Sequence, residues 1–309
     1  MKNFKTISID DYKALKPFFE NQPYELSVYS LASIICWNTA VASPYYKIEG
    51  DTLLMSHLFE KEKEHDHLML PMRRDKMATP SELAGYAEKY GYSSYWFVPE
   101  NYISFYGMNA ISEFFDVEEQ SEYEDYIYLS EDLASLKGNK LMKKRNHFNY
   151  FQKNYINTGL AVIQDMTPDT VEDCLDYLEE WCVERDCGQN PESSMLCEKN
   201  AASNAIQNLE KLEMKGLILR LEGKINAIAV ASRISDRMGA LHFEKAVPTI
   251  KGLYQYFDSK CAEILFSGLE YLNKESDMGQ PGLEKAKKSY YPVMRVKSFR
   301  LVVKGLSIS

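Results

Sequence analysis

The chain has 309 residues, of which 45% are hydrophobic and 26% are charged, and its formal net charge is −9. This composition is typical of a soluble globular protein and excludes extensive disorder, and the length allows two domains. No apolar run reaches the roughly 18 residues of a membrane-spanning helix, and residues 1–16 carry charges instead of a signal-peptide core. We therefore expect a cytoplasmic protein without a transmembrane segment, and the negative charge argues against general nucleic-acid binding.

The first half of the chain predicts helices that alternate with strands. Helices are expected over 9–20, 27–37 and 81–90, a strand pair over 45–55 with a turn at Glu49-Gly50-Asp51, and a strand over 95–98. Aromatic side chains are concentrated between Tyr86 and Tyr106. They could line a groove for bases or acyl chains, but aromatic residues favour strands and the interfaces between layers, so we expect sheet packing.

The second half repeats this order with clearer signals. Thr167-Pro168-Asp169 is a typical helix start, and period-two alternation around Glu222-Gly223-Lys224 predicts a hairpin over 217–232. The expected elements are a strand over 159–164, helices over 168–185 and 200–214, the hairpin, and then strand, loop, helix, strand, helix and a closing hairpin over 239–304. The repetition predicts an α/β (α+β) fold of two tandem domains, 1–150 and 151–309, each a mixed, mostly antiparallel sheet flanked by helices.

Two features of the second half resemble known proteins. The order of hairpin, strand, loop, helix and strand resembles the GNAT acyltransferases, in which two neighbouring parallel strands splay apart and the donor's acyl group lies in the gap. Gly282-Leu283-x-x-x-Lys287-x-x-Tyr290-x-Pro292, followed by Lys297, resembles the ending of the soluble catalytic domain of bacterial aminoacyl-phosphatidylglycerol synthases. The chain is identified by this resemblance as a member of the phosphatidylglycerol lysyltransferase C-terminal domain family, which is GNAT-like.

Two earlier segments agree with the resemblance. Residues 138–147 (GNKLMKKRNH) and 24–30 (YELSVYS), the latter followed by Trp37, are similar to stand-alone cytosolic members of the family. The sequence departs from the family at Glu284, where Arg is usual, and at Lys297, where many members have Arg, so an anion contact there would differ in shape. The resemblance implies two tandem GNAT-like domains, of which the C-terminal one carries the active site. We expect it to stand alone, without the transmembrane domain of lipid-exporting members.

The resemblance also implies an activity. It implies an acyl-group transferase, and specifically an aminoacyltransferase that moves an amino acid from aminoacyl-tRNA to an anionic lipid, such as phosphatidylglycerol, or to another small-molecule acceptor. It implies no cofactor, and it is compatible with peripheral membrane contact. The first alternative is an acyl-CoA-dependent N-acyltransferase, although residues 246–252 lack the glycine-rich loop of coenzyme A users. The second is a non-catalytic binding module for a phosphate-bearing ligand.

Charge is distributed unevenly along the chain. Residues 113–132 contain nine acidic residues and no basic one, whereas residues 137–153 contain six Lys or Arg and no acidic one. A second basic cluster lies near the C-terminus, at Lys285, Lys287, Lys288, Arg295, Lys297, Arg300 and Lys304. The two basic patches could meet around one groove and attract phosphate-bearing ligands. Alternatively, their positive charge balances the acidic segment.

Five basic residues are the candidates for phosphate contact. Lys143, Lys144 and Arg145 are expected to hold the tRNA end or an acidic acceptor. The resemblance places Lys287 and Lys297 at positions associated with anion binding near the reaction centre.

Five further residues are the catalytic candidates. Glu244 and His242 alternate with Phe243 on a strand, so their side chains are expected to share one face. Glu244 would bind the α-ammonium group and His242 would accept a proton from the acceptor. Asn273 and Asp277 would orient the donor ester, and Tyr290 would protonate the leaving ribose oxygen. A structural ion pair or cap is an equal alternative for each of these residues.

Cysteine and histidine residues invite two other kinds of site. The six cysteines show no C-x-x-C pair and are interpreted as free thiols, with a catalytic role for Cys187 disfavoured. His57, His65 and His67 have no fourth ligand at a familiar spacing, so a solvated loop or strand edge is favoured over a metal site.

Overall fold

The computed structural model describes residues 4–20, 22–39, 42–74, 76–184 and 194–305. The chain forms two compact units. The first unit comprises Met1–Asp125, Glu275–Pro281 and Arg295–Ser309, and the second comprises Tyr126–Lys274 and Gly282–Met294. Each unit contains residues distant in sequence, because the chain returns to the first unit after crossing the second.

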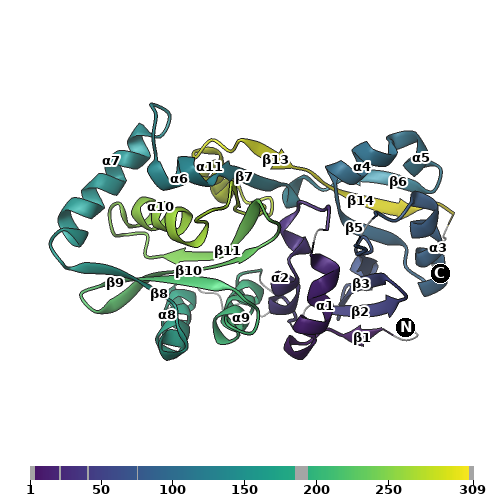
Figure 1. Cartoon of the computed structure of the whole chain (residues 1–309), viewed down its shortest axis with the longest axis horizontal. Coiled ribbons are helices and arrows are strands. Elements are labelled where there is room, and N and C mark those ends of the chain that lie inside the picture. The colour runs from purple at the N-terminus through teal and green to yellow at the C-terminus, as the bar shows by residue number, and fades with distance from the viewer. Residues whose placement is uncertain (1–3, 21, 40–41, 75, 185–193, 306–309) are drawn as a thin grey trace. The chain divides into compact units, whose positions relative to one another are not determined.

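The first unit is built on a seven-stranded sheet with the order β1-β2-β3-β4-β5-β14-β6. Its strands are β1 (Lys5–Thr6), β2 (Ala42–Glu49), β3 (Thr52–Phe59), β4 (His67–Leu68), β5 (Ser94–Pro99), β14 (Ser298–Val303) and β6 (Phe115–Glu119). Strands β4 and β5 pair in parallel through Leu68 and Tyr95, and the other neighbours pair antiparallel. The sheet is therefore mostly antiparallel, with one parallel pair near its middle (Figure 1).

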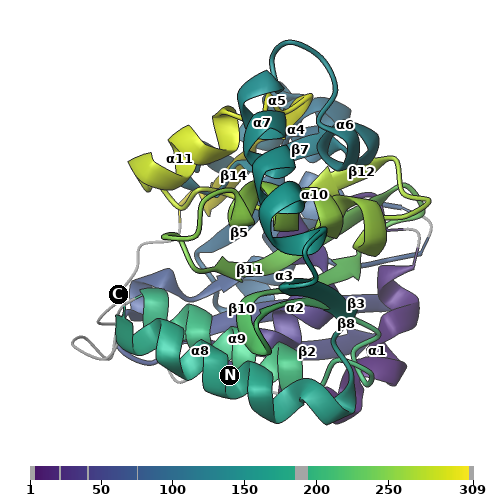
Figure 2. The same ribbon diagram turned by 90° about the vertical axis from the view of Figure 1, so that its left-hand side faces the viewer.

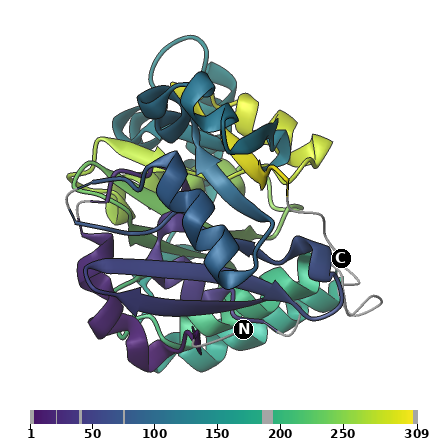
Figure 3. The same cartoon turned by 90° about the vertical axis from the view of Figure 1, so that its right-hand side faces the viewer.

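The helices of the first unit are α1 (Tyr12–Phe19), α2 (Leu31–Cys36), α3 (Pro80–Tyr90), α4 (Glu100–Tyr106) and α5 (Met108–Ser112). Helix α3 begins with a capping box, in which the side chains of Thr79 and Glu82 each accept a hydrogen bond from the other residue's backbone N–H. It ends at Gly91, whose φ of 75° is the left-handed conformation that glycine adopts most easily. Figure 3 faces this unit and shows α3 in front of the strands.

The second unit is built on another seven-stranded sheet, with the order β13-β7-β12-β11-β10-β9-β8. Its strands are β13 (Met294–Val296), β7 (Asp125–Leu129), β12 (Tyr271–Asn273), β11 (Met238–Ala246), β10 (Lys224–Arg233), β9 (Lys215–Leu221) and β8 (Ala161–Asp165). Strands β11 and β12 form the parallel pair, while β12 with β7 and the run from β11 to β8 pair antiparallel. The two units thus share one design.

Helices cover both faces of the second sheet. They are α6 (Ser130–Ser135), α7 (Met142–Phe151), α8 (Val171–Glu184), α9 (Ser194–Gln207), α10 (Leu253–Leu265) and α11 (Pro281–Lys288). Helix α10 lies on one face with α7 outside it, and α8 and α9 lie on the opposite face (Figure 2). Leu217, Ala229, Leu241, Phe257 and Cys261 belong to the buried core between α10 and the sheet. This core fixes the position of every side chain that points from β11 or α10 into it.

The predicted fold class is confirmed, because the chain is a mixed α/β protein with two mostly antiparallel sheets flanked by helices. Two finer predictions fail. The units divide at Asp125 and not near residue 150, because β7, α6 and α7 pack with the second sheet. The closing hairpin is wrong as well, because β13 joins the second sheet while β14 lies between β5 and β6 in the first. Leu301 on β14 is fully buried there, which favours this insertion.

The aromatic segment of the first half packs as predicted. Tyr92, Tyr95, Trp96 and Tyr102 are buried against the sheet or its helices, and Phe105 is the exposed exception. Tyr95 donates a hydrogen bond to the backbone carbonyl of Leu83 on α3, which fastens the helix to β5.

Candidate functional site

The parallel strands β11 and β12 diverge in the middle of the second sheet. They pair from Met238 and Tyr271 to Ala240 and Asn273, and there the pairing ends. Strand β11 continues to Ala246, so Glu244 lies in the part that has left its parallel neighbour. Lys274 follows the last residue of β12 directly. The divergence therefore places a carboxylate on one strand opposite an ammonium group at the end of the other.

A buried ion cluster occupies this divergence. The Nζ atom of Lys274 lies 3.0 Å from Oε2 of Glu244 and 2.5 Å from Oδ1 of Asp258 on α10. Asp258 is 3% exposed, Glu244 11% and Lys274 14%. One cation thus compensates two carboxylates in a weakly polar environment, where breaking such pairing is costly.

Glu244 has the properties of a proton acceptor. Burial and the nearby charge of Asp258 raise its pKa to about 7, against the opposing effect of Lys274. Its second oxygen, Oε1, is buried and has no hydrogen-bond partner among the residues that the structure describes. Burial opposes the positive charge of Lys274. The nearby carboxylates of Asp258 and Glu244 nevertheless hold the pKa of its ammonium group well above the usual value. The cluster therefore combines a fixed cation with a carboxylate that titrates near neutral pH.

Tyr290 forms the next layer of the cluster. Burial, together with the charge of Asp258 and a hydrogen bond between the two side chains, raises the pKa of its phenol well above the usual value. The ring lies 4.0 Å from Nζ of Lys144 on α7 and 5.6 Å from Nζ of Lys274. Burial lowers the pKa of Lys144. Tyr290 is therefore a protonated phenol near two ammonium groups.

Lys287 fastens α11 to the cluster. Its Nζ atom donates a hydrogen bond of 2.6 Å to the backbone carbonyl of Lys274, and the hydroxyl of Tyr128 donates one of 2.8 Å to the backbone carbonyl of Lys287. Its ammonium group also lies 5.9 Å from the ring centre of Tyr126. These contacts orient the segment that carries Lys274, so they support a positioning role for Lys287.

Four predicted site residues therefore lie together in the second unit, namely Glu244, Tyr290, Lys144 and Lys287. Asn273 is fully buried on β12, directly before Lys274, with its backbone paired to Ile127. Lys143 is exposed on α7. Arg145 donates to the backbone carbonyls of Leu136 and Gly138 and so holds the loop before α7. The roles assigned to these residues stay predictions.

The shared face predicted for His242 and Glu244 is wrong. The register between β10 and β11 shifts between Val230 and Ala231, which pair with Phe243 and Leu241, so His242 is the extra residue of a β-bulge. Its Nε2 atom lies 2.7 Å from the hydroxyl of Ser232, the neighbour of the core residue Ala231. Alternation puts Ser232 on the opposite face of β10 from Ala231. His242 therefore points away from the Glu244 cluster.

Two predicted site residues, Asp277 and Lys297, belong to the first unit. Asp277 accepts a hydrogen bond of 2.9 Å from the backbone N–H of Gly279 in a turn. Lys297 forms a surface ion pair of 3.1 Å with Glu119. Both contacts are structural, and such a surface ion pair contributes little to stability.

The second basic cluster is divided in the same way. Strand β14 pairs with the acidic strand β6 and its flank, and ion pairs join Arg295 to Glu124, Arg300 to Glu118 and Lys304 to Asp116. For these residues the interpretation as a groove for phosphates is wrong, because carboxylates of the acidic segment neutralise them. Lys285, Lys287 and Lys288 lie on α11 instead.

Lys274 and Asp258 were not predicted. Asp258 carried a usable signal, because it is a carboxylate within the buried stripe of α10, beside Phe257, Cys261 and Leu265. A charged residue at such a position needs a buried partner. Lys274 carried a weaker signal, as the first residue after a buried strand.

The start of α10 is closed by α7. Gly252 precedes α10 with a φ of 85°, and a Cβ atom built on it would lie 2.3 Å from the backbone carbonyl oxygen of His147. Nζ of Lys251 lies 4.2 Å from the ring centre of Tyr150, also on α7. Coenzyme A users hold pyrophosphate at the start of this helix, and here α7 packs closely against Gly252 at that end of α10.

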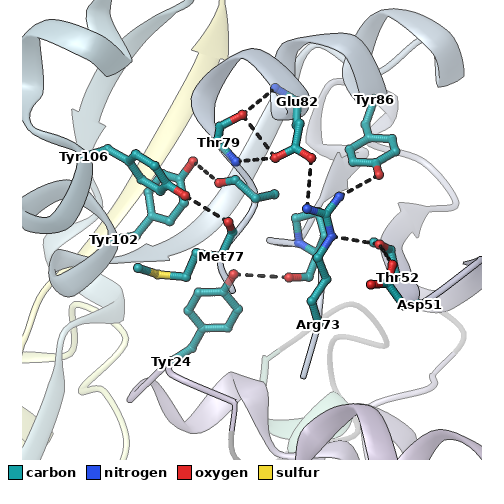
Figure 4. A network of polar contacts seen from close by, with 12 residues as sticks. Tyr24, Asp51, Thr52, Arg73, Met77, Thr79, Glu82, Tyr86, Tyr102 and Tyr106 are labelled. Atoms are coloured by element: carbon teal, nitrogen blue, oxygen red, sulfur yellow. Dashed lines mark hydrogen bonds and ion pairs between the residues drawn. The ribbon is translucent and has the colours of Figure 1, made fainter. Parts of the chain in front are cut away.

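The first unit contains a different polar network (Figure 4). The guanidinium group of Arg73 donates to Thr52 at 2.8 Å, to Glu82 at 2.9 Å and to Tyr86 at 3.0 Å. Hydrogen bonds from Thr79 and the ion pair with Arg73 hold the pKa of Glu82 below its usual value. The hydroxyls of Tyr24, Tyr102 and Tyr106 donate to backbone carbonyls around it. Each guanidinium nitrogen has a partner, so this network ties loop to helix.

Of the three histidines that suggested a metal site, His67 is buried and His57 is partly buried, so the prediction of a solvated segment is wrong for His67. His57 on β3 and His67 on β4 are paired residues whose rings stack at 5.3 Å, and His67 also stacks on Trp96 at 4.7 Å. Burial lowers the pKa of His57 to about 4 and holds that of His67 well below its usual value. His65 is exposed beside Glu62. Within the described residues, no group of three His, Cys, Asp or Glu side chains could hold a metal ion.

The cysteines that the structure describes in full are buried free thiols, as predicted, at Cys36, Cys174, Cys182 and Cys261. Burial raises the pKa of Cys36 to about 12 and that of Cys174 to about 11, which makes these thiols unreactive. Cys187 lies outside the described residues.

Comparison with known proteins identifies the family. The family model described as phosphatidylglycerol lysyltransferase, C-terminal, matches residues 22–302. The chain belongs to this family. The prediction from the Gly282–Pro292 motif is thereby confirmed. Among the described residues, no helix has both the length and the apolar character needed to cross a membrane.

Solved structures share the fold of this chain. A conserved protein of unknown function from Bacteroides thetaiotaomicron is 29% identical, with a TM-score of 0.86, over 98% of this chain and 100% of the other. The C-terminal domain of a putative lysylphosphatidylglycerol synthetase from Agrobacterium fabrum is 11% identical, with a TM-score of 0.65, over 94% and 91%. A tandem GNAT protein from the clavulanic acid pathway is 6% identical, with a TM-score of 0.50, over 99% of both chains, so the likeness is one of fold.

A curated relative is similar in sequence. An uncharacterized protein from Mycoplasmoides gallisepticum is 27% identical over 182 residues, which are 58% of this chain and 56% of the relative. The match thus spans little more than half of that relative's length. Its name states no activity.

Proposed function

We propose that this family member is an aminoacyltransferase that moves an amino acid from aminoacyl-tRNA to an anionic lipid or another small acceptor. One observation carries the proposal. A carboxylate with a pKa of about 7 and an unpartnered oxygen, Glu244, lies where two parallel strands diverge. In GNAT-like folds the reacting acyl group lies at this divergence.

Glu244 is the proposed general base. A carboxylate that titrates near neutral pH is matched to removing a proton from a hydroxyl or amine of the acceptor. Oε1 takes that proton, and the acceptor atom then forms a bond to the carbonyl carbon of the aminoacyl ester. Because Lys274 stays paired with Asp258, the cluster keeps a compensated charge when Glu244 becomes neutral. This role replaces the one predicted for His242, which points away from the cluster.

Tyr290 is the proposed proton donor to the leaving group. The bond between the carbonyl carbon and the ribose 3′ oxygen breaks as the new bond is completed, and that oxygen needs a proton. The high pKa of Tyr290 keeps its phenol protonated at neutral pH. After transfer, the proton held by Glu244 restores the phenol, so the enzyme returns to its starting state. Lys144 and Lys274, whose Nζ atoms lie 4.0 Å and 5.6 Å from the centre of the ring, stabilise the transient phenolate.

Lysines around Tyr290 and Tyr291 are proposed to hold phosphates of the tRNA end. Nζ of Lys140 lies 5.4 Å from the ring centre of Tyr291, and Nζ of Lys144 lies 4.0 Å from that of Tyr290. The loop before α7 and the turn after α11 therefore meet in one unit. Positive charge gathered there attracts phosphate even on an acidic protein. The acyl-CoA alternative is less well supported, because α7 packs closely against Gly252 at the start of α10.

The test is transfer of labelled amino acid by the purified chain. It is incubated with a mixed pool of labelled aminoacyl-tRNAs and a lipid and metabolite extract, and ribonuclease-resistant label is followed. Glu244→Gln keeps the shape of the side chain and removes the base, so turnover should fall by about 100-fold to 10,000-fold. Glu210→Gln, at an exposed position of the same unit, is the matched control and should leave turnover unchanged.

Three results would count against the proposal. If no label leaves tRNA in the presence of verified charged species and acceptors, aminoacyl transfer is wrong. Full activity of Glu244→Gln would overturn the role of this carboxylate. Equal losses of ligand binding and turnover in the variant would favour the non-catalytic binding module.

A further inference from the structure

The parallel strands of the first sheet are bridged by a side chain just beyond the point where they pair. Strands β4 and β5 pair through Leu68 and Tyr95, and the same register continued by two residues would pair Leu70 with Phe97. The hydroxyl of Tyr29 lies between these two residues instead. It accepts a hydrogen bond of 3.4 Å from the backbone N–H of Leu70 and donates one of 3.1 Å to the backbone carbonyl of Phe97. Two hydrogen bonds through a hydroxyl therefore replace one direct backbone bond of about 2.9 Å.

The backbone of β5 is shaped to meet this hydroxyl. Phe97 has a φ of 58°, a left-handed conformation that is costly for a bulky residue. The register between β5 and β14 shifts beside it, between Phe299 and Leu301, which marks a β-bulge. The N–H of Phe97 donates a hydrogen bond of 3.0 Å to the side chain of Gln120. The fold thus keeps a strained backbone whose carbonyl is directed at Tyr29.

The segment that carries Tyr29, residues 24–30, is one of those that resemble family members. Tyr29 is 1% exposed, and its ring lies 4.6 Å from that of Tyr24. The hydroxyl of Tyr24 donates a hydrogen bond of 3.1 Å to the backbone carbonyl of Pro71 (Figure 4). The segment is therefore bonded to consecutive residues that follow β4 in the chain. Its two aromatic rings fill the space beside the parallel pair.

The parallel pair of the second unit has a different occupant. There Glu244 and Lys274 lie where β11 and β12 diverge, and one oxygen of Glu244 has no hydrogen-bond partner among the described residues. In the first unit the hydroxyl of Tyr29 both accepts and donates. Burial raises the pKa of this phenol well above its usual value, so it keeps the proton that it donates. The position in the first unit is thus closed by a neutral group whose hydrogen bonds are made.

We propose that the first unit keeps a second ligand position between its parallel strands, and that the chain itself fills this position with the phenol of Tyr29. The position is recognised by one hydroxyl that accepts from a backbone N–H and donates to a backbone carbonyl. The matching class of ligand is therefore a small para-substituted phenol. While Tyr29 is in place, the first unit has no open position for an acyl group. The inference goes beyond the proposed function, because it does not depend on what the second unit transfers.

The first test empties the position with Tyr29→Ala. The ligand 4-methylphenol has the atoms of the missing side chain, so it should bind this variant and raise its melting temperature, while the unchanged chain should not respond. Toluene lacks the hydroxyl and should bind about 100-fold more weakly, about tenfold for each of the two lost hydrogen bonds. The ether 4-methylanisole can accept but cannot donate, so its affinity should lie between the two. Titration calorimetry measures the three affinities.

Tyr102→Ala is the matched control. Tyr102 is a fully buried tyrosine of the same unit, and its hydroxyl donates a hydrogen bond of 2.9 Å to the backbone carbonyl of Ala78. A cavity at this position should accept both molecules, with a preference for 4-methylphenol over toluene of about tenfold. The control thereby separates a position built around a hydroxyl from an ordinary cavity in the core.

The second test keeps the ring and removes only the hydroxyl, so it decides the question even if Tyr29→Ala does not fold. In Tyr29→Phe the N–H of Leu70 loses its acceptor, and its hydrogen exchange should accelerate by about tenfold or more. The N–H groups of Met69 and Met72 donate to backbone carbonyls on β3 and should keep their exchange rates. These two amides are the internal control for general loosening of the unit.

Three results would overturn the proposal. A preference of Tyr29→Ala for 4-methylphenol that is no larger than that of Tyr102→Ala would show an ordinary core cavity. Binding of 4-methylphenol to the unchanged chain as tight as to Tyr29→Ala would place the site elsewhere. An unchanged exchange rate of Leu70 in Tyr29→Phe would show that β4 and β5 close into a direct hydrogen bond. Neither test measures aminoacyl transfer, so failure of this inference is distinguishable from failure of the proposed function.

Discussion

Each unit builds a polar network around one largely buried basic residue, and the two networks differ. Each sheet also contains one parallel strand pair, β4 with β5 in the first unit and β11 with β12 in the second. In the first unit Arg73 gives each of its three nitrogens a partner, and its carboxylate partner Glu82 is 40% exposed (Figure 4). In the second, Lys274 serves two carboxylates that are at most 11% exposed.

The two networks differ in whether their carboxylate keeps an oxygen without a hydrogen-bond partner. Glu82 has a lowered pKa and all its contacts are saturated, so the network contributes stability without reactive capacity. Glu244 has a raised pKa and an oxygen without a hydrogen-bond partner in the described residues, so its environment favours the binding of a proton. A network in which every polar group is hydrogen-bonded stabilises the fold. A network that keeps a polar atom without a partner can also bind or transfer a proton.

Removal of the central cation should give the largest difference in unfolding free energy between the two units. Lys274→Met leaves two buried carboxylates facing each other, and loss of one partner from a buried pair costs about 3–5 kcal/mol. Arg73→Met leaves Glu82 bonded to Thr79 and partly in water, so we expect a cost of about 1.5–3 kcal/mol. Urea unfolding measures both values.

The control for this pair is Lys211→Met at an exposed position, which should change the free energy of unfolding by less than about 0.5 kcal/mol. The loss in Lys274→Met should be smaller at acidic pH, because Glu244 then binds a proton and one buried negative charge is removed. A loss no larger than that of Arg73→Met at every pH would show that the second cluster is no more dependent on its cation than the first.

The raised pKa of Glu244 predicts how activity and stability depend on pH. Turnover should fall as pH drops through about 7, because the protonated carboxyl cannot act as a base. Stability changes in the opposite sense. The folded-state pKa lies above the ordinary value of 4.5, so the contribution of this group is fully present below that value and is lost as pH rises through about 7.

The two dependences can be measured together. A pH profile of turnover in the unchanged chain should show the acidic limb. Unfolding of the unchanged chain and of Glu244→Gln, compared from acid to neutral pH, should show the stability difference shrink or reverse toward low pH. A profile that is flat between acid and neutral pH would assign Glu244 an ordinary pKa and remove the contrast with Glu82.

The sequence predicts the elements of this fold better than their pairing. Helices and hairpins follow local periodicity, so the hairpin at Glu222-Gly223-Lys224 and the helix after Thr167 are as expected. The insertion of β14 between β5 and β6 joins residues far apart in the chain, and no local pattern specifies it. The bulge at His242 is equally invisible, because it depends on the register of a partner strand.

The same limit applies to the site. Motif resemblance pointed to Lys287 and Tyr290, which lie at the cluster, and also to Lys297, which lies in the first unit beside Glu119. Lys274 and Asp258 were missed, because their ion pair joins the end of a strand to the middle of a helix. A charged residue in an apolar helix stripe shows that a partner exists without naming it.

Two tyrosines give the smallest expected effect on stability and the finest test of the comparison. Tyr86 accepts a hydrogen bond of 3.0 Å from Arg73, and Tyr290 is hydrogen-bonded to Asp258. Replacing either by Phe removes one hydroxyl, at a cost of about 0.5–1.5 kcal/mol in unfolding free energy. Turnover should separate them, because Tyr290→Phe removes the proposed proton donor, whereas Tyr86→Phe alters a structural network. If both variants lose stability as expected but have equal turnover, Tyr290 is not the proton donor to the leaving group. That role would then pass to the protonated Glu244.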